Sequence, residues 1–142
     1  MRFLTIYKAQ ERNTPPTTEE FAAMGNLIEE WSKKGVLLST EGCLPSAKGA
    51  RVRRSGGKLT VTDGPFTESK ELIAGFAILQ ANSKAEAIEL CKRFLEVAGD
   101  GESEIRQIAE ADDFGAEFTP ELREQEERQR ARMSENRPSP GA

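Results

Sequence analysis

The sequence contains no histidine and only two cysteines, and aromatic residues make up 6% of it. Without histidine the chain can build neither a Ser-His-Asp nor a Cys-His nucleophile system, and it has no imidazole to act as a general base. Cys43 and Cys91 form no CxxC pair and, without histidine, are too few for a structural zinc site. We therefore expect no metal centre and two small, buried thiols in a reduced protein.

Long apolar runs are also missing. The apolar stretch at residues 1–8 is interrupted too soon for a signal sequence or a membrane span, so we expect a cytoplasmic protein with no membrane partner. Lysine and arginine are slightly outnumbered by acidic residues, which gives a net charge of −4 and argues against a nucleic-acid partner. The 142 residues suffice for one domain with a sizeable core.

Alternating or locally concentrated apolar residues predict the strands of a sheet. These strands are expected at residues 2–9, 36–40, 72–81 and 104–109. Two further short strands, at 50–54 and 58–62, are separated by Ser55-Gly56-Gly57, in which the glycines allow the positive φ of a tight hairpin turn.

Two capping boxes, each a serine or threonine three residues before a glutamate, predict the starts of two helices. Thr17 and Glu20 form the first box, and Ser83 and Glu86 form the second. Apolar residues follow both boxes at helical spacing, which is typical of a face that packs into a core. The first stripe consists of Phe21, Met24, Leu27, Ile28 and Trp31, and the second of Ala87, Ile88, Cys91, Phe94, Leu95 and Ala98.

Without the hairpin, the element order is β-α-β-β-α-β. This order predicts an α+β, ferredoxin-like domain in which both helices cover one face of a four-stranded antiparallel sheet. The other face would carry apolar side chains such as Leu4, Ile6, Phe76 and Ile78. Because a large apolar face is unfavourable in water, we expect a second copy of the chain to cover it in a homodimer.

Composition changes near residue 112, so we predict a domain over residues 1–111 and an extension over 112–142. Thr119-Pro120-Glu121 predicts the start of a polar helix over about 120–133, with glutamates before arginines as the helix dipole favours. Residues 134–142 are expected to be disordered. The apolar side chains of the extension are expected to pack on the domain or on its partner rather than to take a functional role. They are Phe114, Phe118 and Leu122.

The segment Val61-Thr62-Asp63-Gly64-Pro65-Phe66-Thr67-Glu68-Ser69-Lys70-Glu71, followed by Ile73-Ala74-Gly75-Phe76, resembles the signature of the DGPF (DGPFAETKE) family of the YCII-related group. Thr67 stands where alanine is usual, and Ser69 where threonine is usual. Residues 41–45 and 51–53 also resemble the family's second segment, so that the resemblance covers about residues 1–110.

This resemblance implies a dimeric α+β barrel in which two ferredoxin-like sheets face each other. It also implies a small bacterial protein, often encoded near extracytoplasmic-function sigma factors. In the broader group it implies enzymatic activity through a His-Asp pair. Asp63 is present here, but the chain has no histidine, so the pair as a whole does not carry over.

Asp63 is the candidate catalytic residue, with two interpretations. As a turn residue, it would accept a backbone hydrogen bond while Gly64 and Pro65 set the chain direction and Phe66 fills the core. As a functional residue, it would point into a cleft of the dimer, where apolar walls would raise the pKa of its carboxyl group and make it a base near neutral pH.

Candidate ligand-binding residues lie on the predicted strands and next to the signature. Arg51 and Arg53 share one face of a strand and would hold an anion, unless the hairpin is simply solvated. Lys70 would either pair with carboxylates or bind the same anion. Tyr7, the only tyrosine, and Glu41 are candidates for polar contacts with a ligand or for ordinary strand positions.

Two functions fit these residues. The first is a small-molecule enzyme that uses Asp63 in a dimer cleft and needs no cofactor, with the arginines holding a small anionic substrate. The alternative is a non-catalytic dimer that binds a metabolite or a protein, in stress signalling linked to sigma factors.

Overall fold

The computed structural model describes residues 1–67 and 72–138. It contains helices and an antiparallel sheet, so the α+β class predicted from the sequence is confirmed. The contacts divide the chain into two compact units, Met1–Ile108 and Ala109–Ala142, which are described in turn below.

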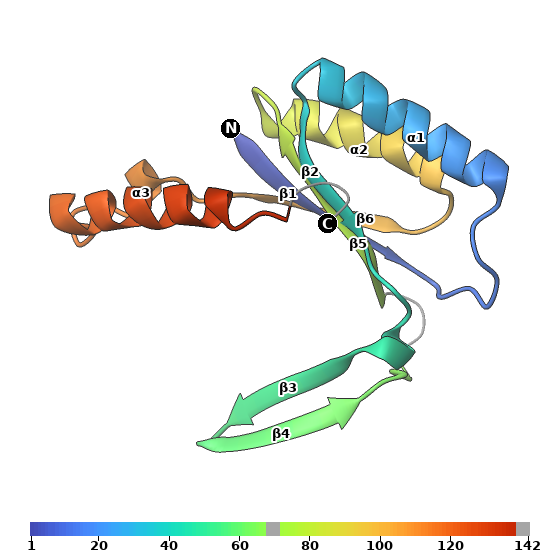
Figure 1. Cartoon of the computed structure of the whole chain (residues 1–142), viewed down its shortest axis with the longest axis horizontal. Coiled ribbons are helices and arrows are strands. Elements are labelled where there is room, and N and C mark those ends of the chain that lie inside the picture. Colours follow the sequence, from blue (N-terminus) through green and yellow to red (C-terminus); the bar gives the residue numbers. More distant parts are fainter. Residues whose placement is uncertain (68–71, 139–142) are drawn as a thin grey trace. The chain divides into compact units, whose positions relative to one another are not determined.

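Four strands of the first unit form one sheet with the order β2-β5-β1-β6 (Figure 1). Every pair of neighbouring strands in this sheet is antiparallel. The strands are β1 (Arg2–Ala9), β2 (Leu37–Gly42), β5 (Leu72–Gln80) and β6 (Glu102–Gln107). All four occur where the sequence predicts strands: the bounds of β1 agree with the prediction, and those of the other strands differ from it by at most two residues.

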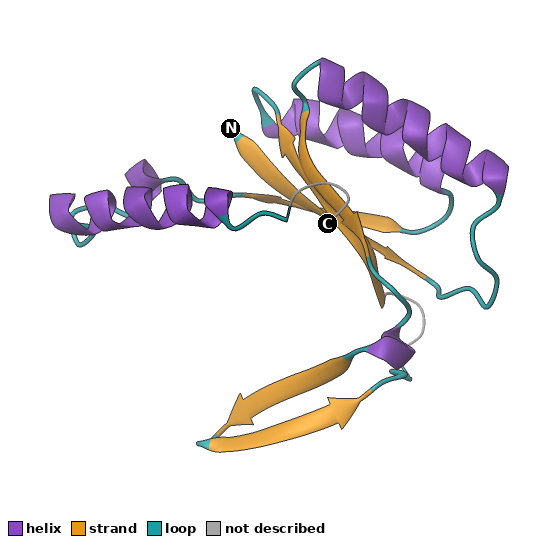
Figure 2. Cartoon of the chain, viewed as in Figure 1, coloured by secondary structure: helices purple, strands orange, loops and turns teal. Residues whose placement is uncertain are grey.

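Helices α1 (Thr18–Lys33) and α2 (Lys84–Ala98) lie side by side on the same side of the sheet (Figures 1 and 2). Both predicted capping residues are confirmed. The Thr17 hydroxyl accepts a hydrogen bond from the Glu20 amide at 3.2 Å. The Ser83 hydroxyl accepts one from the Glu86 amide at 3.1 Å. Each bond satisfies one of the free amides at a helix start.

The core lies between these two helices and one face of the sheet. Its buried residues are Leu27, Trp31, Leu79 and Cys91 in one cluster and Phe3, Ala81 and Ala87 in another. Two predicted burials are wrong. Phe21, one turn before the buried part of the α1 stripe, is 64% exposed, and Cys43, just after β2, is exposed.

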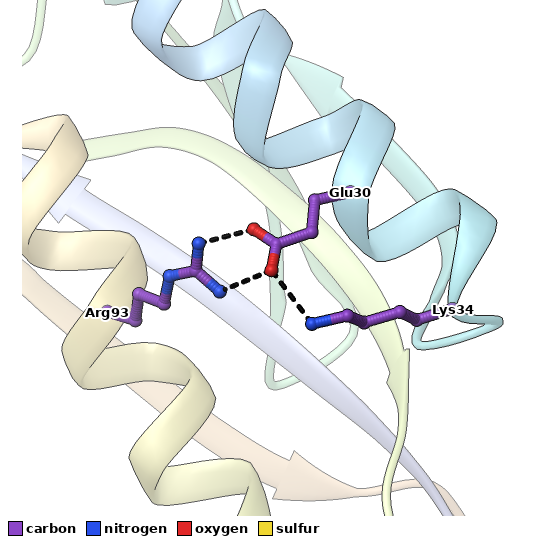
Figure 3. A network of polar contacts seen from close by, with 3 residues as sticks. All are labelled: Glu30, Lys34 and Arg93. Carbon is purple, nitrogen blue, oxygen red and sulfur yellow. Dashed lines mark hydrogen bonds and ion pairs between the residues drawn. The ribbon is translucent and has the colours of Figure 1, made fainter.

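Outside the core, α1 and α2 are joined by the carboxylate of Glu30 (Figure 3). Both guanidinium nitrogens Nη1 and Nη2 of Arg93 on α2 donate to the two Glu30 oxygens, and Lys34 Nζ lies 2.8 Å from Glu30 Oε1. The hydrogen bonds from Arg93, and then those from Lys34, lower the pKa of Glu30 to about 2.

The second face of the sheet, here called the open face, is not covered by α1 and α2. Strand alternation places Leu4 beside Ile78 and Ile6 beside Phe76 on this face, whereas Phe3 lies on the face that the helices cover. These four side chains are half-buried.

Between β2 and β5 the chain forms a 3₁₀ turn, η1 (Ser46–Lys48), and a hairpin of β3 (Ala50–Ser55) and β4 (Lys58–Asp63). The predicted Gly56-Gly57 turn is confirmed, since both residues have the positive φ that favours glycine, 56° and 79°. All residues of β3 and β4 are exposed.

The register of this hairpin gives its two faces different chemistry. The face here called the valine face carries Ala50, Val52, Arg54, Leu59, Val61 and Asp63. The arginine face carries Arg51, Arg53, Ser55, Lys58, Thr60 and Thr62.

The second unit contains a short 3₁₀ turn, η2 (Ala111–Asp113), and α3 (Pro120–Glu135), whose start is capped by the Thr119 hydroxyl. The helix continues through Ser134 and Glu135, where we expected disorder. Within this unit the rings of Phe114 and Phe118 lie 5.3 Å apart and line an open groove together with residues of α3. The lining residues from α3 are Leu122, Gln125, Glu126 and Gln129.

Candidate functional site

The signature segment that follows β4 is held in place by Ser46 at the start of η1. The Ser46 hydroxyl accepts a hydrogen bond from the Phe66 amide and donates one to Glu11 Oε2, each at 3.1 Å. The Ser46 amide also donates to the second oxygen of Glu11. One largely buried serine thereby joins the β1–α1 loop, the β2–β3 connection and the signature.

Gly64 lies directly against this serine. Its amide donates to the Gly49 carbonyl at 3.0 Å, and an ideal Cβ at residue 64 would lie 1.7 Å from the Ser46 carbonyl oxygen. Any side chain would collide with the backbone there. The glycine of the signature is therefore required by close packing of two backbone segments.

Phe66 is half-buried and does not belong to either core cluster, so the prediction that it fills the core is wrong. The guanidinium carbon of Arg51 lies 3.9 Å from the centre of its ring. This is a cation–π contact, in which the negative face of the ring attracts the guanidinium charge. Phe66 thus orients Arg51 on the arginine face.

Asp63 is exposed at the end of β4, opposite Ala50. Within the described part of the chain, its carboxylate has no hydrogen-bond or ion-pair partner. The apolar walls expected around this group are not supplied by the described residues of its own chain.

The arginines and the aspartate do not share one face. Arg51 and Arg53 are two residues apart on β3 and lie together on the arginine face, as predicted. Asp63 lies on the valine face, because it pairs with Ala50 rather than with Arg51. A site that combines all three groups does not form on a single hairpin.

The hydroxyl group and the ring of Tyr7 both contact other residues of the same chain. Its hydroxyl donates to the Asp100 carbonyl at 2.9 Å, and its ring packs edge-on against Phe94 of α2 at 5.2 Å between ring centres. Burial raises the pKa of Tyr7, and the charge of Asp100 raises it further. The tyrosine thus lies on the helix side of the sheet.

Glu41 lies on β2 opposite Phe76 and is therefore on the open face, away from Tyr7. The structure does not bring Tyr7 and Glu41 together. Lys70, the remaining candidate ligand residue, lies outside the described residues.

Sequence reasoning missed Glu11 and Ser46. Both are polar residues in predicted loops, where such residues are common. Their importance comes from partners far along the chain, since Ser46 is 35 residues from Glu11 and 20 from Phe66. No local pattern marks such a contact.

Among residues 1–67 and 72–138, no group of three or more cysteine, aspartate or glutamate side chains is arranged to hold a metal ion. In the same residues, no helix combines the length and the apolar character needed to cross a membrane.

The known proteins that match this chain cover different fractions of its length. An uncharacterized protein of Rhizobium meliloti (strain 1021) is 33% identical over 67 residues, which are 46% of this chain and 54% of the relative, so the match spans about half of that relative's length. A solved structure, 5-chloro-2-hydroxyhydroquinone dehydrochlorinase (TftG) from Burkholderia phenoliruptrix AC1100 in complex with 2,5-dihydroxybenzoquinone, matches with a TM-score of 0.43 and 14% identity. That match covers 77% of this chain and 94% of the other.

The family comparison extends furthest. The model of the YCII-related domain matches residues 1–116, which include the whole sheet, both core helices, the hairpin and the signature segment. The chain therefore belongs to the YCII-related domain family.

Proposed function

We propose that this protein is a cytoplasmic homodimer that binds a small anionic ligand on the arginine face of its hairpin. The observation that carries this proposal is the placement of Arg51, Arg53 and Lys58 on one face of an exposed two-stranded ribbon. Guanidinium groups form paired hydrogen bonds with carboxylate and phosphate oxygens, and an ammonium group adds a point charge.

The other strand supplies hydroxyl groups next to these cations. Thr62 lies opposite Arg51, and Thr60 lies opposite Arg53. A hydroxyl group can donate a hydrogen bond to an anion that a neighbouring guanidinium group neutralises. The cation–π contact with Phe66 limits the motion of Arg51, which reduces the entropy lost when an anion binds.

The homodimer is supported by the open face of the sheet. A contiguous apolar group there consists of Leu4 and Ile6 on β1 and Phe76 and Ile78 on β5. Ile73, also on β5, is 54% exposed. Two ferredoxin-like sheets that face each other would bury these residues in a dimeric α+β barrel.

Catalysis by Asp63 is the second candidate function. Its carboxylate has no partner in the described part of the chain, and it shares the valine face with Val52 and Val61. If another subunit covers this face, desolvation will favour the protonated carboxyl group, and such a group can donate and take back a proton as a general acid–base residue does. Such an enzyme would need no cofactor for proton transfer.

Anion binding is tested by thermal shift with inorganic phosphate and with malonate. We expect both anions to raise the Tm of the wild-type protein and of Arg54→Ala, and to have little effect on Arg53→Ala. Arg53 and Arg54 are exposed neighbours on opposite faces, so this pair controls for the loss of one positive charge. Equal responses of the two variants would show that the arginine face is not the site.

The dimer is tested by sedimentation equilibrium at micromolar concentration. We expect the mass of a dimer for the wild-type protein and a shift toward monomer for Ile78→Glu. A wild-type monomer would overturn this part of the proposal.

For the second candidate function, catalysis by Asp63, the substitution Asp63→Asn should abolish turnover of an anionic substrate while binding persists. Unchanged turnover would exclude a catalytic role.

A further inference from the structure

The valine face of the hairpin is apolar but not packed in the single chain. Val52 and Val61 form a cross-strand pair, and Leu59 lies next to them on the same face. Their exposed fractions are 71% for Val52, 66% for Val61 and 67% for Leu59. Cross-strand contact between the two valines therefore leaves most of their surface in water.

A ribbon of two strands rarely has independent stability, because each strand pairs on one side only and the hydrophobic face needs a second layer. Here the Gly64 amide closes the base of the hairpin by bonding to Gly49, and the hydroxyl of Ser46 joins this base to the rest of the first unit through Glu11. The regular pairing from Ala50 to Asp63 nevertheless persists along the whole ribbon. Packing on its apolar side would supply the missing layer.

We infer that the valine face docks on the first unit of a second copy of this chain, so that the hairpin acts as an exchanged arm in the homodimer. This inference rests on the homodimer of the proposed function and names the contact that each hairpin makes in it. Docking would bury Val52, Leu59 and Val61 and leave the arginine face open to the ligand.

Charge complementarity favours a second copy as the occupant. Residues 48–63 contain five basic residues and one acidic residue, whereas the remainder of residues 1–108 contains ten basic and fourteen acidic residues. A basic arm is therefore attached to an acidic body. Because Arg51, Arg53 and Lys58 lie on the arginine face, this attraction acts between the arm as a whole and the body of another chain, and the apolar valine face makes the contact. A two-fold axis forms this contact twice.

The position of the arm in the chain agrees with this arrangement. The hairpin is inserted between β2 and β5, which are neighbouring strands of the sheet that carries the open face. The arm therefore leaves the body from strands that border the proposed dimer interface, and sheet contact and arm contact can belong to one continuous interface.

Two substitutions on adjacent residues test the docking. Val61→Glu places a charge on the valine face, and Thr62→Glu places the same charge on the arginine face of the same strand. Both variants lower the charge of the arm equally, so only the face differs. In sedimentation equilibrium we expect Val61→Glu to raise the Kd of the dimer by at least about tenfold, because it places a charge against a buried apolar surface. Thr62→Glu should remain within about threefold of wild type.

Hydrogen exchange on the unmodified protein gives a second measurement that does not depend on a variant's folding. Amides of residues 50–63 should exchange faster after dilution from dimer to monomer, whereas amides of residues 18–33 in α1 should change little. Equal exchange of residues 50–63 at both concentrations would overturn the docking.

The results separate the arm from the proposed function. A dimer that is weakened by Ile78→Glu but not by Val61→Glu would overturn the arm and leave the sheet interface intact. A wild-type monomer would overturn both. Equal weakening by Val61→Glu and Thr62→Glu would assign the effect to charge alone and reject docking of the valine face.

Discussion

The backbone of Ser46 leaves no room for a side chain at Gly64. An ideal Cβ at residue 64 would lie 1.7 Å from the Ser46 carbonyl oxygen and 2.5 Å from its carbonyl carbon. This close approach, together with the hydrogen bonds of the Ser46 side chain, fixes the signature segment against η1. These contacts hold the base of the hairpin, and the hairpin carries the candidate residues of the arginine face, Arg51 and Arg53.

Replacing Gly64 by alanine should therefore destabilise the protein. We expect a loss of about 1–3 kcal/mol, because backbone atoms at residue 46 must move to admit the methyl group. Gly25→Ala is the matched control, since Gly25 lies within α1 and an added Cβ would meet nothing within 4 Å. Alanine there should stabilise the helix by about 0.5–1 kcal/mol. Urea unfolding measures both changes, and a Gly64→Ala protein as stable as wild type would contradict the geometry.

The hydrogen bonds of Ser46 predict a second loss of stability. Ser46→Ala removes the acceptor of the Phe66 amide and one donor to Glu11, in a largely buried place. We expect a loss of about 1–3 kcal/mol in urea unfolding, which is typical when a buried polar group loses its partner. Ser55→Ala, at an exposed hairpin residue, should change stability by less than about 0.5 kcal/mol. Similar effects of the two substitutions would show that Ser46 does not hold the signature.

The Glu30 carboxylate predicts a dependence of stability on pH. Its pKa is lowered from 4.5 to about 2 in the folded protein, so its contribution is present above 4.5 and is lost as the pH falls toward 2. The Tm difference between wild type and Glu30→Gln should therefore be constant near neutral pH and vanish on acidification. It should also shrink in high salt, because these groups are largely exposed.

Glu29→Gln provides the comparison for this measurement, because the ion pair of Glu29 with Lys33, at 2.7 Å, lies within α1. Its effect on Tm should be smaller than that of Glu30→Gln, which also loses the contact between two helices. A Tm difference for Glu30→Gln that is the same at every pH would contradict an electrostatic origin.

The two thiols should react at different rates in the folded protein. Cys43 is exposed, whereas Cys91 is buried between α2 and the sheet, where burial raises the pKa of its thiol and a hydrogen bond with Ser103 partly opposes this. A thiol reagent should modify one equivalent rapidly and the second only after unfolding, since the thiolate is the reactive form. The rapid phase should disappear in Cys43→Ser. Two rapid equivalents in the native protein would contradict the burial of Cys91.

Local features of this fold were predictable from the sequence. Thr17 and Ser83 cap helices because their partners, the amides of Glu20 and Glu86, are three residues away. The Gly56-Gly57 turn was also predictable locally, because tolerance of positive φ is a property of glycine itself. The alternation of apolar residues in β1 likewise predicts a strand with two apolar faces.

The candidate site was less predictable, because its geometry depends on pairing between distant segments. A shift of one residue in strand pairing exchanges the faces of a strand. The observed register places Asp63 opposite Ala50 and away from Arg51 and Arg53, which separates groups that the enzyme hypothesis combines in one cleft. Tyr7 bonds to Asp100 only because β1 and β6 are neighbours in the sheet.

The sequence by itself determined the α+β class, the order of the elements, the capping residues and the hairpin turn, since these depend on periodicity and on contacts within a few residues. It also excluded histidine chemistry outright. Only the tertiary structure decided that Ser46 and Glu11 hold the signature, that Gly64 must lack a side chain, and that Asp63 lies on the valine face, away from Arg51 and Arg53. The hydrogen bonds of Ser46 span 20 and 35 residues of chain, whereas the Ser46–Gly64 contact and the hairpin pairing join segments that lie closer together in the sequence. All of these contacts exist only after the sheet and its connections have folded.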